Sequence, residues 1–168
     1  MTQAANLAAL GSNATSNGTI SGSVIQVVQG TYGTSASTTS TTSVDTGVSA
    51  TITPKFSTSK ILVIVSMSAQ SYVTSGNARD TGGSFTVVRN STTIWGSTGT
   101  VNFYIDGSNV ATLSFNILNT WGINYLDSPA TTSAITYKVQ YNAISGRTMV
   151  INPSSNSTST ITLMEVAA

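Results

Sequence analysis

Apolar residues occur in short clusters along most of the chain, and Ser, Thr, Gly and Asn fill the gaps between them. Alternation of apolar and polar residues is most regular over residues 135–141. Such alternation turns one set of side chains toward a core and is typical of β-strands. The pattern predicts about eight to ten short strands, the clearest at residues 24–32, 44–52, 60–67, 85–88, 101–105, 121–125, 135–141 and 161–166.

The run at residues 60–67 predicts the strongest strand. It begins as a continuous apolar stretch at residues 61–65 and ends in alternation. We therefore expect it to be central in its sheet and packed on both faces at one end. In the last strand, alternation places Glu165 on the same face as Ile161 and Leu163.

Loops separate the predicted strands. The Ser- and Thr-rich residues 34–43 and the segment 76–83 are expected to be loops, and residues 106–109 (Asp-Gly-Ser-Asn) a hairpin turn followed by a returning strand at 110–117. No segment predicts a convincing helix, and no internal repeat favours a β-helix or propeller. The sequence predicts an all-β fold, an antiparallel β-sandwich of jelly-roll type.

The first 22 residues predict an extended N-terminal arm, and residues 23–168 the β-sandwich domain. Residues 4–10 have the composition for one or two helical turns, but Gly11, Gly18 and Gly22 interrupt any longer pattern. Fully extended, 22 residues reach about 70 Å, far enough to contact a neighbouring subunit. Candidate anchoring side chains in this arm are Leu7, Leu10 and Ile20. No signal peptide is expected, because a basic stretch followed by an apolar one is absent there.

Composition excludes several classes of function. The chain of 168 residues has no His, no Cys and a net charge of +1, with six basic and five acidic residues. His-dependent triads, Cys nucleophiles, zinc sites and haem ligation are therefore excluded, and no disulfide can form. So small a charge predicts no nucleic-acid partner and no anionic membrane partner. The longest apolar runs are also too short to span a bilayer. We expect no cofactor and no bound metal.

The acidic residues are the remaining candidates for catalysis. They are Asp45, Asp80, Asp106, Asp127 and Glu165. A glycosidase needs two carboxylates about 5–9.5 Å apart, and Asp80 with Asp106 is the pair to consider because both are expected in longer loops. Residues 77–80 and 106–109 also carry oxygen donors that suit calcium. Turn capping explains most of these residues better, so we expect no catalytic residue and no enzyme activity.

Two further features concern binding. Trp95, Trp121 and Tyr125 are candidates for stacking on a glycan, or for a core or subunit interface. The chain also has 27 Ser and 29 Thr, one third of all residues. A neutral hydroxyl surface can pack against a neighbouring subunit without burying an unpaired charge, which would cost several kcal/mol. This composition favours a protein that is permanently packed among other subunits.

Several stretches resemble a module of tailed-bacteriophage virion proteins, especially those of cyanophages and other marine phages. The resemblance covers roughly residues 24–168 and rests on STTSVDTGV at 40–48, TITP at 51–54, STSKILV at 57–63, FTVVRNSTTI at 85–94, LDSP at 126–129, ITYKV at 135–139 and TITLMEV at 160–166. Proteins with this module either decorate or cement the capsid or form the tips of tail and head fibres. The family implies no catalytic residues.

The resemblance implies a structural protein of a phage virion. The chain begins with Met and has no long fibre shaft, which favours a decoration or cement protein on the phage head surface. Its expected partners are the major capsid protein and copies of itself, as a homotrimer. The alternative is a tail or head fibre tip that binds a host-surface glycan through Trp95, Trp121 and Tyr125.

Overall fold

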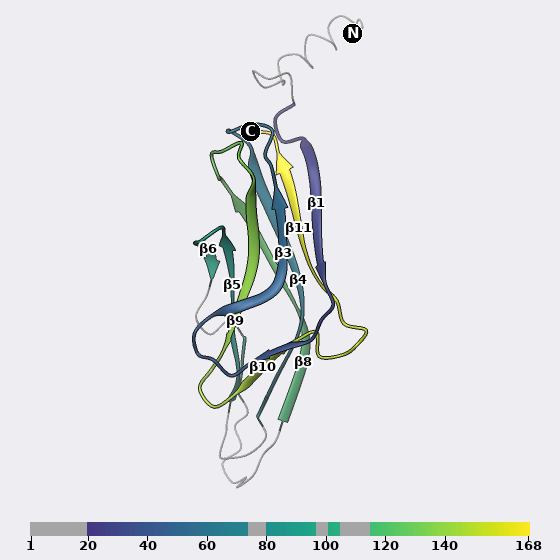
Figure 1. Ribbon diagram of the computed structural model, residues 1–168, viewed down its shortest axis with the longest axis vertical. Coiled ribbons are helices and arrows are strands. Elements are labelled where there is room, and N and C mark those ends of the chain that lie inside the picture. Colours follow the sequence, from purple (N-terminus) through teal and green to yellow (C-terminus); the bar gives the residue numbers. More distant parts are fainter. Residues whose placement is uncertain (1–19, 74–79, 97–100, 105–114) are drawn as a thin grey trace, which may run out of the picture.

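The computed structural model describes residues 20–73, 80–96, 101–104 and 115–168 of the chain (Figure 1). These residues form strands and no helix. In chain order the strands are β1 (Val24–Tyr32), β2 (Ala36–Thr38), β3 (Val44–Ile52), β4 (Lys60–Val73), β5 (Asp80–Arg89), β6 (Thr92–Gly96), β7 (Val101–Tyr104), β8 (Phe115–Asp127), β9 (Ile135–Ala143), β10 (Thr148–Ile151) and β11 (Ser159–Val166).

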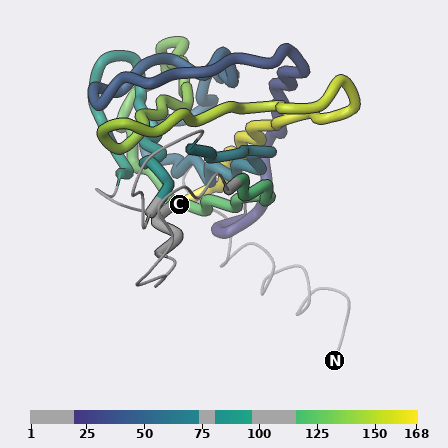
Figure 2. Tube along the Cα trace, turned by 90° about the horizontal axis from the view of Figure 1, so that it is seen from below, coloured from purple at the N-terminus to yellow at the C-terminus, as the bar shows by residue number. Residues whose placement is uncertain are grey.

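The strands form two antiparallel sheets that pack face to face (Figures 1 and 2). One sheet has the order β1-β11-β4-β10-β2, with β8 on the other edge of β4; the second has the order β3-β9-β5-β6, with β7 also paired to β5. If the short strands β2, β7 and β10 are left out, eight strands remain, and they can be renumbered 1 to 8 in chain order. In this numbering the two sheets have the orders 1-8-3-6 and 2-7-4-5. These are the strand orders of a jelly roll, so the predicted fold class is confirmed.

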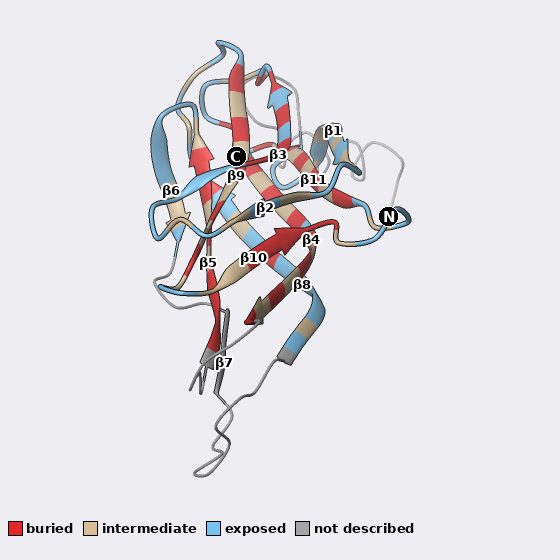
Figure 3. Cartoon of the chain, turned by 60° about the horizontal axis from the view of Figure 1, so that its bottom comes forward, coloured by how far each residue is buried: buried red, intermediate tan, exposed pale blue. Residues whose placement is uncertain are grey.

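The core lies between the two sheets, and its residues alternate with less buried ones along the long strands β3, β4, β9 and β11 (Figure 3). Inward residues of β4 such as Ile61, Val63 and Met67 pack against Tyr137 and Tyr141 of β9 in one buried cluster. The central position predicted for residues 60–67 is confirmed, because β11 and β10 pair with one edge of β4 and β8 with the other. The predicted packing on both faces is wrong for the described residues, since no second layer covers the outer face.

Three predicted boundaries are wrong. Residues 80–83, expected in a loop, begin β5, where the backbone of Gly83 lies so close to Asn142 that no larger residue fits. We expected one strand to end at residue 117 and the next to begin at residue 121. This break is absent, because β8 pairs with β4 without interruption from Phe115 to Asp127. A short strand, β2, lies inside the Ser- and Thr-rich segment 34–43. The predicted hairpin turn at 106–109 lies outside the described residues.

Candidate interaction surface

Four apolar side chains form a continuous row across the outer face of the β4 sheet. Strand register places Val27 of β1 opposite Met164 of β11, Met164 opposite Leu62 of β4, and Leu62 opposite Leu126 of β8. Val27 is 56% exposed and Leu126 50%, while Leu62 and Met164 are half-buried. Val24, 49% exposed, and its partner Val166 extend the row toward the end of the sheet. We call these six residues the apolar stripe.

The surroundings of the apolar stripe are polar but almost uncharged. The next row toward the sheet centre contains Asn124, Ile64, Thr162 and Gln29, and Gln29 Nε2 donates to Thr162 Oγ1 at 2.9 Å. Among the described outward-facing residues of β1, β4, β8 and β11, Lys60 alone is charged, and its Nζ donates to Ser128 Oγ at 3.2 Å. Contiguous exposed apolar surface of this kind is typical of interaction sites.

Directly beneath the apolar stripe, on the inner face, lie two buried carboxylates. Glu165 of β11 and Asp127 of β8 are both opposite Ile61 of β4, so they flank it in one row. Glu165 is fully buried and Asp127 is 5% exposed. Two strand spacings place their backbones about 10 Å apart.

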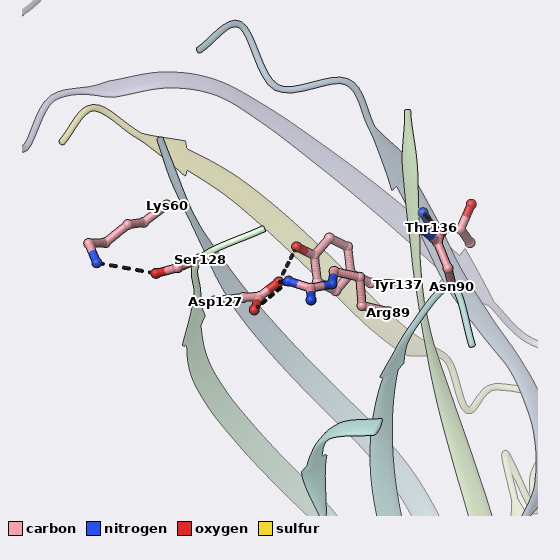
Figure 4. A network of polar contacts seen from close by, with 7 residues as sticks. All are labelled: Lys60, Arg89, Asn90, Asp127, Ser128, Thr136 and Tyr137. Atoms are coloured by element: carbon pink, nitrogen blue, oxygen red, sulfur yellow. Dashed lines mark hydrogen bonds and ion pairs between the residues drawn. The ribbon is translucent and has the colours of Figure 1, made fainter. Parts of the chain in front are cut away.

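Asp127 connects the two sheets (Figure 4). Arg89 Nη1, from β5, donates to both carboxylate oxygens at 2.9 and 2.8 Å, and Tyr137 Oη, from β9, donates to Oδ2 at 2.7 Å. The Arg89 side chain is 25% exposed, whereas Tyr137 is fully buried. Burial, together with the hydrogen bond to Asp127, raises the pKa of Tyr137, so its hydroxyl stays neutral and acts as a donor.

Glu165 fixes the connection between β3 and β4. The backbone N–H groups of Lys55 and Phe56 donate to Oε1 at 2.7 and 3.3 Å, and Gln26 Nε2 donates to Oε2 at 2.6 Å. Burial alone would raise the pKa of Glu165, but these hydrogen bonds favour the charged form and lower its pKa below the ordinary value. The carboxylate therefore orders a loop beside the apolar stripe.

Of the remaining acidic side chains, the structure describes that of Asp45. Asp45 is exposed and accepts hydrogen bonds from Lys138 Nζ at 2.9 Å and Gln140 Nε2 at 2.7 Å; these bonds, the one from Lys138 foremost, lower the pKa of Asp45. Asp106 and the Asp80 side chain lie outside the described residues, as does most of both predicted calcium segments. Asp127 and Glu165 each have their oxygens occupied by donors. Among the described residues no group of three or more His, Cys, Asp or Glu could hold a metal.

The structure places the predicted binding residues in separate locations. Leu7 and Leu10 lie outside the described residues, whereas Ile20 is 45% exposed and its carbonyl accepts from Ser23 N–H at 3.0 Å. Trp95 of β6 and Trp121 of β8 belong to different sheets, and both are half-buried against the core. Tyr125 of β8, opposite Val63, is also half-buried. Their role in glycan binding, and the role of the arm, stay predictions.

Alternation in the sequence correctly placed Glu165 on the face of Ile161 and Leu163, which is the buried face of β11. Sequence reasoning missed the row that Glu165 forms with Asp127, and it missed the apolar stripe. For Asp127, whose position before Ser128-Pro129 was attributed to turn capping, no local signal exists. The stripe depends on the register of four strands that are distant in sequence. No helix within the described ranges has the length and apolarity needed to cross a membrane.

Comparison with known proteins shows similarity in backbone arrangement only. No family model matches the chain, and no curated protein matches it. The chain is similar to VP2 of infectious bursal disease virus in its subviral particle, with a TM-score of 0.44 and 12% identity, over 89% of this chain and 39% of that one. For VP2 in derived T=1 particles the TM-score is 0.39, with 13% identity over 89% and 38% of the chains. The chain spans about two-fifths of the length of these structures.

Proposed function

We propose that this chain is a structural protein of a bacteriophage virion, a decoration or cement protein that binds the outside of the head shell and stabilises it through contacts with neighbouring subunits. It acts by binding and is not an enzyme. Its partners are the major capsid protein and other copies of the chain, arranged as a trimer at sites of local threefold symmetry. The sequence resemblance to phage virion proteins motivates the proposal.

The observation that carries the proposal is the uncharged apolar stripe on the outer face of a jelly-roll sheet. Val27 and Leu126 are both about half exposed. Burying them in a contact would remove apolar surface from water, which stabilises the contact by about 25 cal/mol per Å². A contact through the stripe would meet a single charge, because Lys60, which lies beside Val166, is the sole charged residue among the described outward-facing residues of the four strands. Jelly rolls are common in viral capsid proteins, which supports the proposal by analogy of fold.

The mechanism is added contact area between subunits. Packaged DNA presses outward on a phage head, and a protein bound across several capsid subunits must be detached before those subunits can separate. Residues 1–22, if they extend to a neighbouring subunit, would enlarge this contact. Leu7, Leu10 and Ile20 are the side chains proposed to anchor that arm.

Electron cryomicroscopy of purified particles tests the location of the chain. We expect density that fits the jelly roll on the head surface, with the apolar stripe against a neighbouring subunit. We also expect the isolated protein to bind expanded, empty capsids and a variant lacking residues 1–22 to bind them more weakly. Density at a fibre tip, together with binding to purified host polysaccharide, would contradict the proposal and support the glycan-binding alternative.

A further inference from the structure

The free edges of the two sheets are not alike. β1 has a register shift between Val24 and Gln26, and the Gln26 side chain bonds to Thr53 O at 2.8 Å. β3 has a register shift between Asp45 and Ser49, and β2, β6 and β7 are short. Bulges and short strands are devices that prevent a sheet edge from pairing with another chain.

β8 has none of these devices. It pairs with β4 in unbroken register from Phe115 to Asp127, 13 residues, and no described strand pairs with its other edge. The strand contains no Lys, Arg or Pro, and its one charged residue, Asp127, is held by Arg89. Two of its outward-facing side chains are large, apolar and exposed: Leu118 at 60% and Leu126 at 50%. Such an edge is a template for strand addition.

The direction of the backbone restricts how another strand can pair. The N–H of Thr120 donates to its neighbour Asn119 Oδ1 at 2.8 Å, which marks it as turned away from β4. Alternate residues of an antiparallel strand direct their N–H and C=O groups to the same side. The even-numbered residues, including Leu118, Gly122 and Leu126, therefore present their backbone groups at the free edge, and a partner strand must pair with them.

We propose that β8 pairs with β8 of a second copy of this chain, antiparallel, about a twofold axis at Gly122. This register places Leu118 opposite the second copy's Leu126, Thr120 opposite Asn124, and Gly122 opposite Gly122. Shifting the register by two residues in either direction places each leucine opposite a polar residue. Of these three registers, the chosen one alone pairs the exposed leucines with each other, and it places the Leu126 end of each apolar stripe beside Leu118 of the second copy.

The contact area sets the expected strength of this dimer. An axis at Gly122 pairs residues 117–127 of the two strands; these 11 residues span about 37 Å and a sheet is about 10 Å thick, so pairing buries roughly 370 Å² per copy. Standard stable interfaces bury about 800 Å² per partner. We therefore expect a weak dimer that forms at high protein concentration and that would be reinforced wherever copies are held side by side. The inference does not require the proposed virion function, because it concerns the isolated chain.

Cysteine cross-linking tests the twofold axis. The natural sequence has no Cys, so Gly122→Cys introduces a single thiol, and a Cβ at Gly122 meets only Val65 O, at 4.0 Å. Paired residues there would have Cα atoms about 5.5 Å apart, within disulfide range. Ser66→Cys is the matched control, because Ser66 lies beside Gly122 on β4, exposed, but away from the edge. Mild oxidation should dimerise Gly122→Cys at least about tenfold faster than Ser66→Cys; equal rates would overturn the proposal.

Charge substitution tests the register. Leu118→Lys and Leu126→Glu should each weaken the dimer about tenfold in Kd, measured by analytical ultracentrifugation, because each removes apolar contacts twice per dimer. The double variant should recover most of the loss in a salt-dependent way, since every Lys then faces a Glu. Both sites are exposed, and circular dichroism checks that each variant folds. A double variant that dimerises no better than the single ones would refute this register.

Discussion

At the scale of single residues, Asp127 and Glu165 lie in the same row beside Ile61 but are held by different kinds of donor. Asp127 is bound by side chains of the opposite sheet, whereas Glu165 is bound by the backbone of a loop and by the Gln26 side chain of its own sheet. A buried carboxylate is stable only when such donors replace the water it has lost. Each residue therefore reports on a different contact: Asp127 on sheet-to-sheet packing and Glu165 on the loop before β4.

Asp127→Asn should destabilise the protein. Removing one partner of a buried ion pair costs roughly 3–5 kcal/mol, and since a quarter of the Arg89 side chain is exposed we expect about 2–3 kcal/mol. Urea denaturation measures the loss. Lys138→Gln, which breaks the more exposed pair with Asp45, is the control and should cost less than about 1 kcal/mol. Equal losses would show that Asp127 does not hold the sheets together.

Glu165 predicts how stability depends on pH. Its pKa is lower in the folded protein than in the unfolded chain, where it is about 4.3. Its contribution is therefore fully present above about pH 4.3 and is lost as the pH falls through the lower, folded value. Glu165→Gln should lower the free energy of unfolding at pH 7 and flatten its decline in acid. Asp45→Asn serves as a comparison, because the pKa of Asp45 is also lowered. An unchanged acid slope in Glu165→Gln would contradict this assignment.

At the scale of elements, the register shift in β3 requires a glycine. Gly47 has a φ of +89°, and a Cβ there would lie 2.5 Å from Cζ of Tyr32. Gly146 is a matched control, since its φ is +74° but a Cβ would meet no atom within 4 Å. Gly146→Ala should cost about 1 kcal/mol for its backbone alone, and Gly47→Ala about 1–3 kcal/mol more because of the overlap. Thermal unfolding measures both, and equal losses would mean that Tyr32 moves aside freely.

Strand patterning predicts elements better than it predicts their ends. The spans of β1 and β3 follow directly from their apolar positions. β4 extends to Val73, beyond the predicted residue 67; the extension was not predicted because the inward residues Ala69 and Ser71 are too small or too polar to give an apolar pattern. The sequence predicts a loop at Gly82 and Gly83, but they lie in β5, where the backbone of Asn142 comes too close to Gly83 for a side chain to fit. Composition excludes chemistry that depends on His or Cys. It cannot predict the apolar stripe, because the stripe depends on how four strands distant in sequence pair with one another.

At the scale of the whole molecule, the apolar stripe should decide whether the protein binds a particle. Val27→Lys places a charge in the stripe, and we expect binding to fall at least about tenfold, because the charge would have to be desolvated. Thr31→Lys adds the same charge to the same strand and face, outside the stripe, and should bind almost normally. Co-sedimentation with capsids that lack the protein measures both. Equal binding by the two variants would place the contact elsewhere.

The start of β1 and the end of β11 lie at the same end of the sandwich. Gly22 N–H donates to Ala167 O at 2.8 Å, and Ala167 N–H donates to Ser23 O at 2.9 Å. A fluorescent or epitope reporter fused after Ala168 would therefore emerge from the pole at which the leading segment also departs. Antibody binding to such a reporter on intact particles would show that this pole points outward. If antibodies do not reach it, foreign cargo intended for display would be better inserted at the opposite pole.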